Sequence, residues 1–171
     1  MRRAKRYLCW ILSFCLLFGV FTGCAKSEKS VGEALFMLLA ECGFENACTL
    51  YSCEKLLQSR DGRAFLASLF GDGEPRAAFY GVKDGALALS KKDNGFEIQV
   101  YRTGHPSQAK DLANVLCDRE ALLKSMWNKR YLGEIFDAYL SSASVYTDGC
   151  FVFLLATGDN DAILEKLEKY L

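Results

Sequence analysis

Residues 77–101 read AAFYGVKDGALALSKKDNGFEIQVY, and this stretch decides the fold class. It contains three runs that are typical of β-strands, at 77–82, 86–90 and 96–101. The runs are separated by Lys83-Asp84-Gly85 and by Asp93-Asn94-Gly95. Asp-Gly and Asn-Gly dipeptides tolerate the positive φ that tight hairpins require, so both separators predict turns. The stretch therefore predicts three neighbouring antiparallel strands.

A second hairpin is expected near the C-terminus, where residues 139–146 and 150–157 flank Thr147-Asp148-Gly149. Within it, residues 151–155 read FVFLL. An unbroken apolar run is expected of a central strand that is covered on both faces. Together the two hairpins predict an α+β domain whose antiparallel sheet has about five strands, with helices packed on one or both faces.

Helix signals precede these strands. Residues 30–33 read SVGE and fit the capping box S-x-x-E, and the helix that begins there should end at Gly43. Its apolar residues recur at helical spacing, at Val31, Ala34, Leu35, Leu38, Leu39 and Cys42. Phe36, Met37 and Ala40 widen this face, which predicts burial on more than one side.

Further helices are expected along the rest of the chain. Asp61 can cap one of them, and Pro106 suits the first turn of the longest one. Asp159 or Asn160 caps the C-terminal helix. Residues 44–59 fit no clear pattern, apart from a helix expected over their second half.

The first 23 residues have the layout of a secretory signal. Four basic residues, all before Tyr7, precede an apolar run over 7–23. Thr22-Gly23-Cys24 after an apolar residue resembles the bacterial lipobox, with Phe21 at the position where leucine is usual. The resemblance implies that the sulfur of Cys24 receives a diacylglycerol, with acyl chains such as palmitate, and that Cys24 becomes the mature N-terminus.

Two alternatives to lipidation stay open, an uncleaved membrane span and ordinary signal cleavage. As a helix, residues 7–23 would extend about 25 Å, slightly less than the roughly 30 Å of a hydrocarbon core, so a span is the second choice. The favoured division is a signal peptide over 1–23, a tether over 24–30 and a single α+β domain over 31–171. Its lipid would hold such a protein on the extracytoplasmic face of the cell membrane.

The charge balance argues against a nucleic-acid partner. The chain has 21 Lys and Arg against 21 Asp and Glu, and four of the basic residues lie in the leader, which leaves 17 after it. The remainder is mildly acidic and has no basic stripe for nucleic acid or for an anionic membrane surface. The expected partners are the membrane, through the lipid anchor, and a protein or small-molecule ligand.

Five cysteines follow Cys24, at Cys42, Cys48, Cys53, Cys117 and Cys150. One or two disulfides with a free thiol left over are compatible with an exported domain, and so is simple burial of the thiols. The spacing of the first three does not match zinc sites, whose ligands usually pair two to four residues apart, and no histidine lies nearby. We therefore predict neither a metal site nor a cofactor.

From about residue 66 onward, several short motifs follow one another. They are Leu69-Phe70-Gly71, Glu97-Ile98-Gln99-Val100-Tyr101, Ala109 through Leu116 to Arg119, Tyr139-Leu140, Val145, Gly149-Cys150-Phe151-Val152-Phe153 and the final amphipathic helix. In this order they resemble an uncharacterised family of bacterial lipoproteins, the domain of unknown function numbered four-three-five-eight. The resemblance implies an α+β fold and a lipobox but supplies no mechanism. Cys42, Cys48 and Cys53 are not part of it.

Glu97 and Arg119 are the candidate ligand-binding residues. The first lies on an expected strand, and the second lies on the long helix that should pack near that strand. The preferred interpretation is a structural ion pair, or solvated charges, at the edge of the sheet, because such pairs are common and are weak evidence of function.

The sequence carries no clear catalytic signature. His105 is the only histidine, and its place in the turn Gly104-His105-Pro106 favours a structural or solvent-exposed role. Neither of the glycine-rich phosphate-binding motifs occurs. The sequence therefore predicts a binding or assembly module rather than an enzyme. The alternatives are a purely structural envelope component and an envelope enzyme that uses Cys48 or Cys53, which requires a cysteine with a low pKa.

Overall fold

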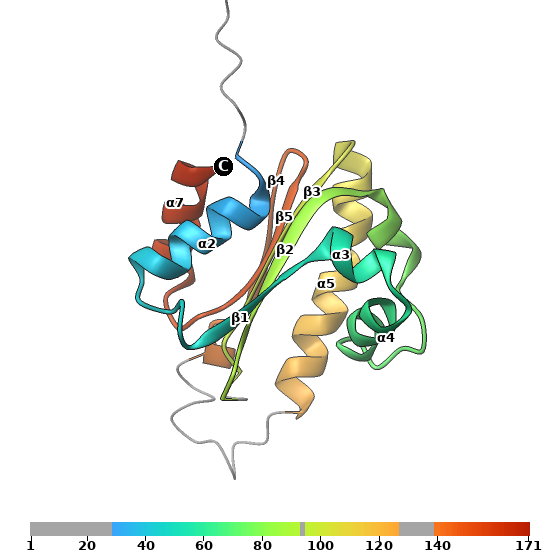
Figure 1. Cartoon of the computed structure of the whole chain (residues 1–171), viewed down its shortest axis with the longest axis horizontal. Coiled ribbons are helices and arrows are strands. Elements are labelled where there is room, and N and C mark those ends of the chain that lie inside the picture. The colour runs from blue at the N-terminus through green and yellow to red at the C-terminus, as the bar shows by residue number, and fades with distance from the viewer. Residues whose placement is uncertain (1–28, 93–94, 127–138) are drawn as a thin grey trace, which may run out of the picture.

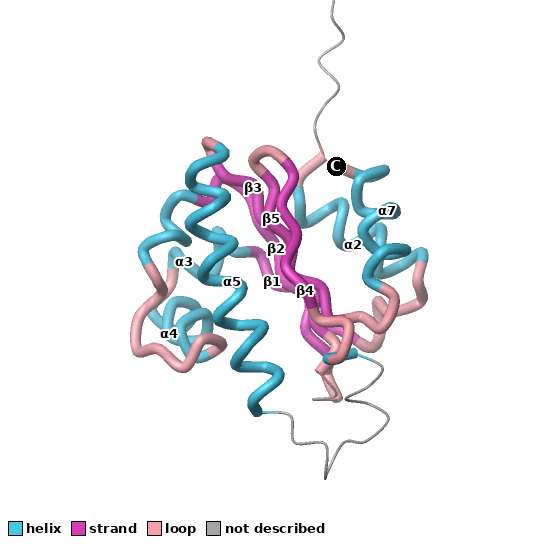
Figure 2. The backbone as a smooth tube through the Cα atoms, turned by 180° about the vertical axis from the view of Figure 1, so that it is seen from behind, coloured by secondary structure: helices cyan, strands magenta, loops and turns pink. Residues whose placement is uncertain are grey.

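The computed structural model of the chain describes residues 29–92, 95–126 and 139–171. The predictions for the signal peptide, for Cys24 and for most of the tether fall outside these residues. A five-stranded antiparallel sheet forms the middle layer, and helices cover both of its faces (Figure 1, and from behind in Figure 2). This confirms the expected α+β class, the antiparallel sheet and its number of strands.

The strands follow the order β1-β2-β3-β5-β4 across the sheet, so β3 is central. They are β1 (Cys48–Ser52), β2 (Val82–Ser90), β3 (Glu97–Thr103), β4 (Ser144–Asp148) and β5 (Phe151–Ala156). The two expected hairpins join β2 to β3 and β4 to β5. Gly95 and Gly149 lie in the connections with positive φ values of 81° and 55°, the conformation that glycine adopts most readily.

The first part of the strand-rich stretch differs from the prediction. Residues 77–81 form a 3₁₀-helix, η1 (Ala77–Gly81), and β2 runs through Lys83-Asp84-Gly85 without a turn. The pairing of β2 with β3 shifts its register between Val82 and Asp84, and this irregularity takes up the turn-like residues. Because β1 and β3 already occupy the two sides of β2, residues 77–81 have no place beside it.

Gly85 is explained by packing rather than by turn geometry. A Cβ atom at this position would lie 2.6 Å from Cδ1 of Tyr101 and 3.2 Å from Cβ of Cys53. Both neighbours are fully buried and have no room to move away. A glycine therefore allows β2 to lie close to Tyr101 of the central strand and to Cys53.

A first core lies between one face of the sheet and the helices α3 (Cys53–Gln58), α4 (Arg60–Ser68) and α5 (Pro106–Met126). α5 is the longest described helix, as expected. The predicted cap of α4 is wrong. The hydroxyl of Ser59, and not the carboxylate of Asp61, caps the helix by accepting the backbone N–H of Gly62 at 2.9 Å. Phe79 of η1 is buried in this core between Phe70 and Tyr101, with ring centroids 5.3 and 5.6 Å away.

A second core lies between the other face of the sheet and the helices α2 (Val31–Glu41) and α7 (Asn160–Tyr170). The predicted capping box is present at α2, where Ser30 and Glu33 each accept the other's backbone N–H at 3.2 Å. Asp159 caps α7. The expected burial of α2 on more than one side is wrong, because no described element covers its outer face and Phe36 is 58% exposed.

β5 contributes to both cores, as its unbroken apolar run predicts. Val152 and Leu154 lie in the first core, and Phe153 and Leu155 lie in the second. Successive side chains of a strand point to opposite faces, so a strand between two helical layers needs apolar residues at every position.

The two edge strands differ from the prediction. β4 begins at Ser144 rather than at residue 139. The sequence pattern does not predict β1, although α3, which follows it, falls within the helix expected over 52–59. Most residues of both strands are partly exposed, so neither strand has the clean apolar alternation that reveals a strand in sequence.

Candidate functional site

Glu97 and Arg119 form an ion pair inside the protein. Nη2 of Arg119 lies 2.9 Å from Oε2 of Glu97, and Nε of Arg119 donates to Oε1 at 3.2 Å. The remaining terminal nitrogen of Arg119 donates to the backbone carbonyl of Leu69. The side chains of Arg119 and Glu97 are 10% and 4% exposed, so the pair is almost fully removed from water.

Two more polar side chains extend this pair along the same face of β3. Gln99 donates its amide to Oε1 of Glu97, and Tyr101 donates its hydroxyl to Oε1 of Gln99 at 2.6 Å. We call Arg119, Glu97, Gln99 and Tyr101 the buried ladder. Burial raises the pKa of the Tyr101 phenol well above its usual range; Cys53 and Glu97 add to the rise, and Arg119 opposes it.

The geometry of the buried ladder favours a structural role. Its members bond to one another or to backbone, and among the described residues every buried side-chain nitrogen and oxygen has a hydrogen-bond partner. This supports the structural ion pair that the sequence favours. Its expected position at the edge of the sheet is wrong, because β3 is the central strand.

The five described cysteines are free thiols. Cys48 belongs to the second core and Cys53 to the first, so the sheet lies between them. Burial raises the pKa of the Cys48 thiol, and burial with the Asp84 carboxylate raises that of Cys53 to about 12. A catalytic cysteine needs a lowered pKa, so both shifts run against an enzyme that uses these thiols.

The raised pKa of Cys53 makes folding stability depend on pH in the alkaline range. The ordinary pKa of the thiol is 9.0, so an unfolded chain loses this proton before the folded chain does, at about 12. The contribution of Cys53 to stability is therefore complete below pH 9 and is lost as the pH rises through this window. We expect urea denaturation to give a free energy of unfolding about 2 kcal/mol lower at pH 10.5 than at pH 8 from this thiol alone.

A Cys53→Ala variant isolates that contribution. Its free energy of unfolding should fall by about 2 kcal/mol less than that of the unmodified protein between the two pH values, because it lacks the thiol whose pKa rises on folding. Cys150→Ala keeps Cys53 and should follow the unmodified protein. If Cys53→Ala and Cys150→Ala lose equal stability with pH, Cys53 is not the titrating group.

His105 lies in the exposed turn before α5, and its contacts are local. Its Nδ1 accepts the backbone N–H of Ser107 at 3.2 Å and lies 2.9 Å from the hydroxyl of the same residue. Its carbonyl accepts the hydroxyl hydrogen of Thr103 at 3.0 Å. These contacts hold the turn from which α5 begins, which supports the structural role preferred from the sequence.

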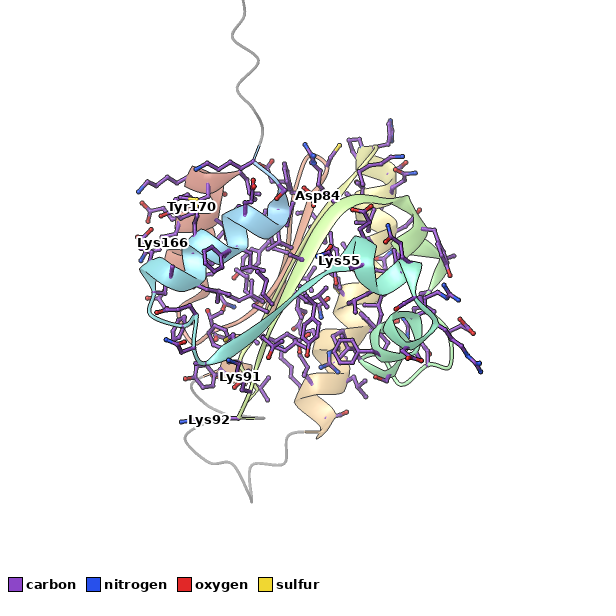
Figure 3. The ribbon with its side chains drawn as sticks, in the orientation of Figure 1. Lys55, Asp84, Lys91, Lys92, Lys166 and Tyr170 are labelled. Atoms are coloured by element: carbon purple, nitrogen blue, oxygen red, sulfur yellow. The ribbon has the colours of Figure 1, made fainter. Side chains whose placement is uncertain are left out.

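A groove lies between the first turns of α2 and the edge of the sheet formed by β1 and β2. Its volume is about 650 Å³. The apolar side chains that line it include Phe36 and Leu50, which are 58% and 37% exposed. Its polar lining includes Lys29, Ser30, Glu33, Ser52, Glu54 and Asp84. We call it the α2–β1 groove; in Figure 3 the labelled Asp84 lies beside the start of α2.

The carboxylates of the α2–β1 groove differ in how their charge is compensated. Asp84 accepts the backbone N–H of Val31 at 2.8 Å and lies 3.9 Å from Nη2 of Arg102, so a helix N-terminus and a guanidinium both stabilise its charge. Glu33 accepts the backbone N–H of Ser30 at 3.2 Å and Glu54 accepts the side-chain amide of Gln58 at 3.0 Å, but both carboxylates are exposed, and neither forms an ion pair within the described part of the chain. The groove therefore has an apolar floor, and its rim is acidic because three carboxylates lie there against a single lysine, Lys29.

The sequence pattern does not identify this groove. The available signal is Phe36-Met37, which lies beside the main apolar face of α2 and predicts burial, whereas in the structure both residues line an open surface. Leu50 lies in a stretch with no clear pattern. Cys24, the predicted lipidation site, lies outside the described residues.

The described residues reveal neither a metal site nor a membrane-crossing helix. Their His, Cys, Asp and Glu side chains form no group of three that could hold a metal ion. None of their helices has both the length and the apolarity that a membrane crossing requires.

No family model, curated protein or solved structure matches the chain. The resemblance to the four-three-five-eight family thus stays a prediction.

Proposed function

We propose that the chain is a lipid-anchored module on the extracytoplasmic face of the cell membrane, and that it binds or assembles with a partner through the α2–β1 groove. The observation that carries the proposal is the pair of exposed apolar side chains, Phe36 and Leu50, in a groove of about 650 Å³. Neighbouring apolar side chains left in contact with water are typical of an interaction site.

The place of the groove relative to the expected anchor supports this function. Lys29, the first described residue, lines the groove. The six residues from Cys24 to Lys29 reach at most about 20 Å when fully extended. A lipid on Cys24 would therefore keep the groove close to the membrane surface, where a membrane-associated partner can reach it.

The anchor is tested by intact-mass measurement on protein extracted from membranes, after expression in a bacterium that processes lipoproteins. We expect the mass of a chain that starts at Cys24 and carries a diacylglycerol, because only the sulfur of that residue matches the lipobox. A Cys24→Ser variant should lack the added lipid mass. A membrane-bound mass that includes Met1 would mean an uncleaved span, and an unlipidated, shortened chain in the soluble fraction would mean ordinary signal cleavage.

A further inference from the structure

Within the described residues, β1 pairs with another strand on one side only. Its residues pair with β2 from Cys48↔Ser90 to Ser52↔Ala86, and β1 is the last strand of the described sheet. A strand in this position presents a row of backbone N–H and C=O groups to which another extended segment can bond. The N–H of Cys48, at the start of β1, already donates to the carbonyl of Phe44 at 3.1 Å. The rest of the edge, from Thr49 to Ser52, is therefore the template for one short further strand.

The α2–β1 groove runs beside this edge and offers side-chain contacts to the same segment. Leu50, in the middle of β1, and Phe36, on α2, both line the groove and are both exposed. A strand added to β1 would place every second side chain on the face of the sheet that Leu50 occupies. Backbone hydrogen bonds would then give affinity, and the groove would select side chains.

The acidic rim indicates the charge of the occupant. Glu33 and Glu54 are exposed, line the groove and form no ion pair within the described residues. A segment with basic side chains would gain favourable interactions with them, whereas the phosphate of an anionic lipid headgroup would be repelled. A second copy paired edge to edge would bring the same two carboxylates to the interface twice, which also disfavours it.

We propose that the groove and the free edge of β1 bind an extended segment of a partner protein that carries apolar and basic side chains on one face, and that this segment adds to the sheet beside β1. The apolar side chains would pack on Phe36 and Leu50, and the basic ones would pair with Glu33 and Glu54. This inference rests on the proposed function of the groove, and it adds the class of partner and the mode of binding.

Binding is tested with the full chain, held in nanodiscs of the zwitterionic lipid phosphatidylcholine, and a fluorescein-labelled peptide of sequence TKTLTLTKT. As a strand, this peptide presents Lys, Leu, Leu and Lys on one face and Thr on the other. We expect fluorescence anisotropy to rise and saturate relative to empty nanodiscs, and hydrogen exchange of the β1 amides to slow. The glutamate counterpart TETLTLTET should bind at least about tenfold more weakly, because its charge repels the rim.

Two variants test the groove. Phe36→Ala should weaken binding of TKTLTLTKT about fivefold or more, because it removes the exposed aromatic side chain on which the leucines of the peptide would pack. Tyr80→Ala is its matched control, since Tyr80 is 63% exposed and does not line the groove, and it should bind as the unmodified protein does. Glu33→Gln with Glu54→Gln removes both charges and keeps a glutamine that can complete the capping box, so the fold is retained while affinity falls about tenfold at low salt.

The mode of binding is tested with a TKTLTLTKT peptide whose three central residues carry N-methyl groups, which removes backbone donors on both edges of the added strand and keeps every side chain. Equal binding of this peptide would refute strand addition, and equal binding of TETLTLTET would refute the role of the acidic rim. If the β1 amides are protected from hydrogen exchange without peptide, and the chain forms a dimer whose population rises with protein concentration, the site would belong to a second copy of the chain. Protection caused only by phosphatidylglycerol in the nanodisc would assign it to a lipid headgroup, and either result would overturn the inference.

Failure of this inference is distinguishable from failure of the proposed anchor. The lipid mass on Cys24 is measured without any peptide. One outcome is a correct lipid mass together with no peptide binding at about millimolar peptide. Because a millimolar Kd corresponds to only about 4 kcal/mol of binding free energy, this outcome would support the anchor and refute the proposed class of partner. Peptide binding by a chain that lacks the lipid mass would remove the anchor and leave the partner class in place.

Discussion

An Arg119→Met variant should lose about 3–5 kcal/mol of the free energy of unfolding, because the carboxylate of Glu97 would stay buried without its partner. Methionine fills much of the space of the arginine stem, so the loss reports the missing charge more than a cavity. The backbone carbonyl of Leu69 loses a donor as well. Urea denaturation at pH 7 measures the loss as a shift of the midpoint at constant slope.

Two companion variants separate a buried ion pair from an ordinary surface one. The double variant Glu97→Gln with Arg119→Met removes both charges and keeps an acceptor for Gln99, so it should be more stable than Arg119→Met alone. Arg76→Met is the control, because Arg76 pairs with Asp72 at 2.7 Å and with Asp118 at 2.5 Å while the three side chains are 31%, 35% and 66% exposed. Exposed pairs contribute at most about 1 kcal/mol each, so its loss should be at most about 2 kcal/mol. Equal losses for Arg119→Met and Arg76→Met would contradict the structural role and favour a ligand site instead.

The parts of the fold that the sequence predicts are those with local causes. The capping box at Ser30 and Glu33 satisfies backbone groups within one helical turn, so it needs no help from the rest of the chain. The same holds for the positive φ of Gly95 and Gly149, which depends on the absence of a Cβ atom. Apolar periodicity also identifies the strand and helix that carry Glu97 and Arg119, although only the fold brings them into contact.

The stretch around Asp84-Gly85 shows where local chemistry stops being decisive. This dipeptide is compatible with a hairpin turn, and in the structure it lies inside β2. Asp84 accepts the backbone N–H of Val31, which is 53 positions earlier in the chain, and Gly85 makes room for Tyr101 on the central strand. Both contacts are made with segments that are distant in sequence, so the residues around Asp84-Gly85 do not predict them.

The α2–β1 groove could not be predicted for a related reason. Its walls come from α2, β1 and β2, so it exists only once these elements have packed together. Phe36 has the spacing of a core residue, and the sequence does not show that no described element covers it. Whether a side chain is exposed depends on whether another element packs over it, whereas apolar periodicity shows only which residues share one face of a helix.

A second large effect is expected at Asn160, which is 5% exposed at the start of α7. Its Oδ1 accepts the backbone N–H and the hydroxyl of Thr157 at 3.1 and 2.8 Å, and its Nδ2 donates to the carbonyls of Leu155, at 3.1 Å, and Ser142. Asn160→Ala leaves several of these buried groups without partners, each at a cost of about 1–3 kcal/mol. Urea denaturation should therefore show a loss of about 2–4 kcal/mol.

Two substitutions at the same helix start test whether these internal bonds carry the effect. Asn160→Asp keeps the size and the acceptor but loses both donors, so it should be destabilised to a similar degree. Asp159→Ala removes the exposed cap on the Ala162 N–H, at 3.2 Å, and should lose only about 1 kcal/mol. If Asn160→Ala loses no more than Asp159→Ala, water replaces the lost bonds. A greater loss means that Asn160 ties the end of β5 to the turn before β4, because its amide contacts both.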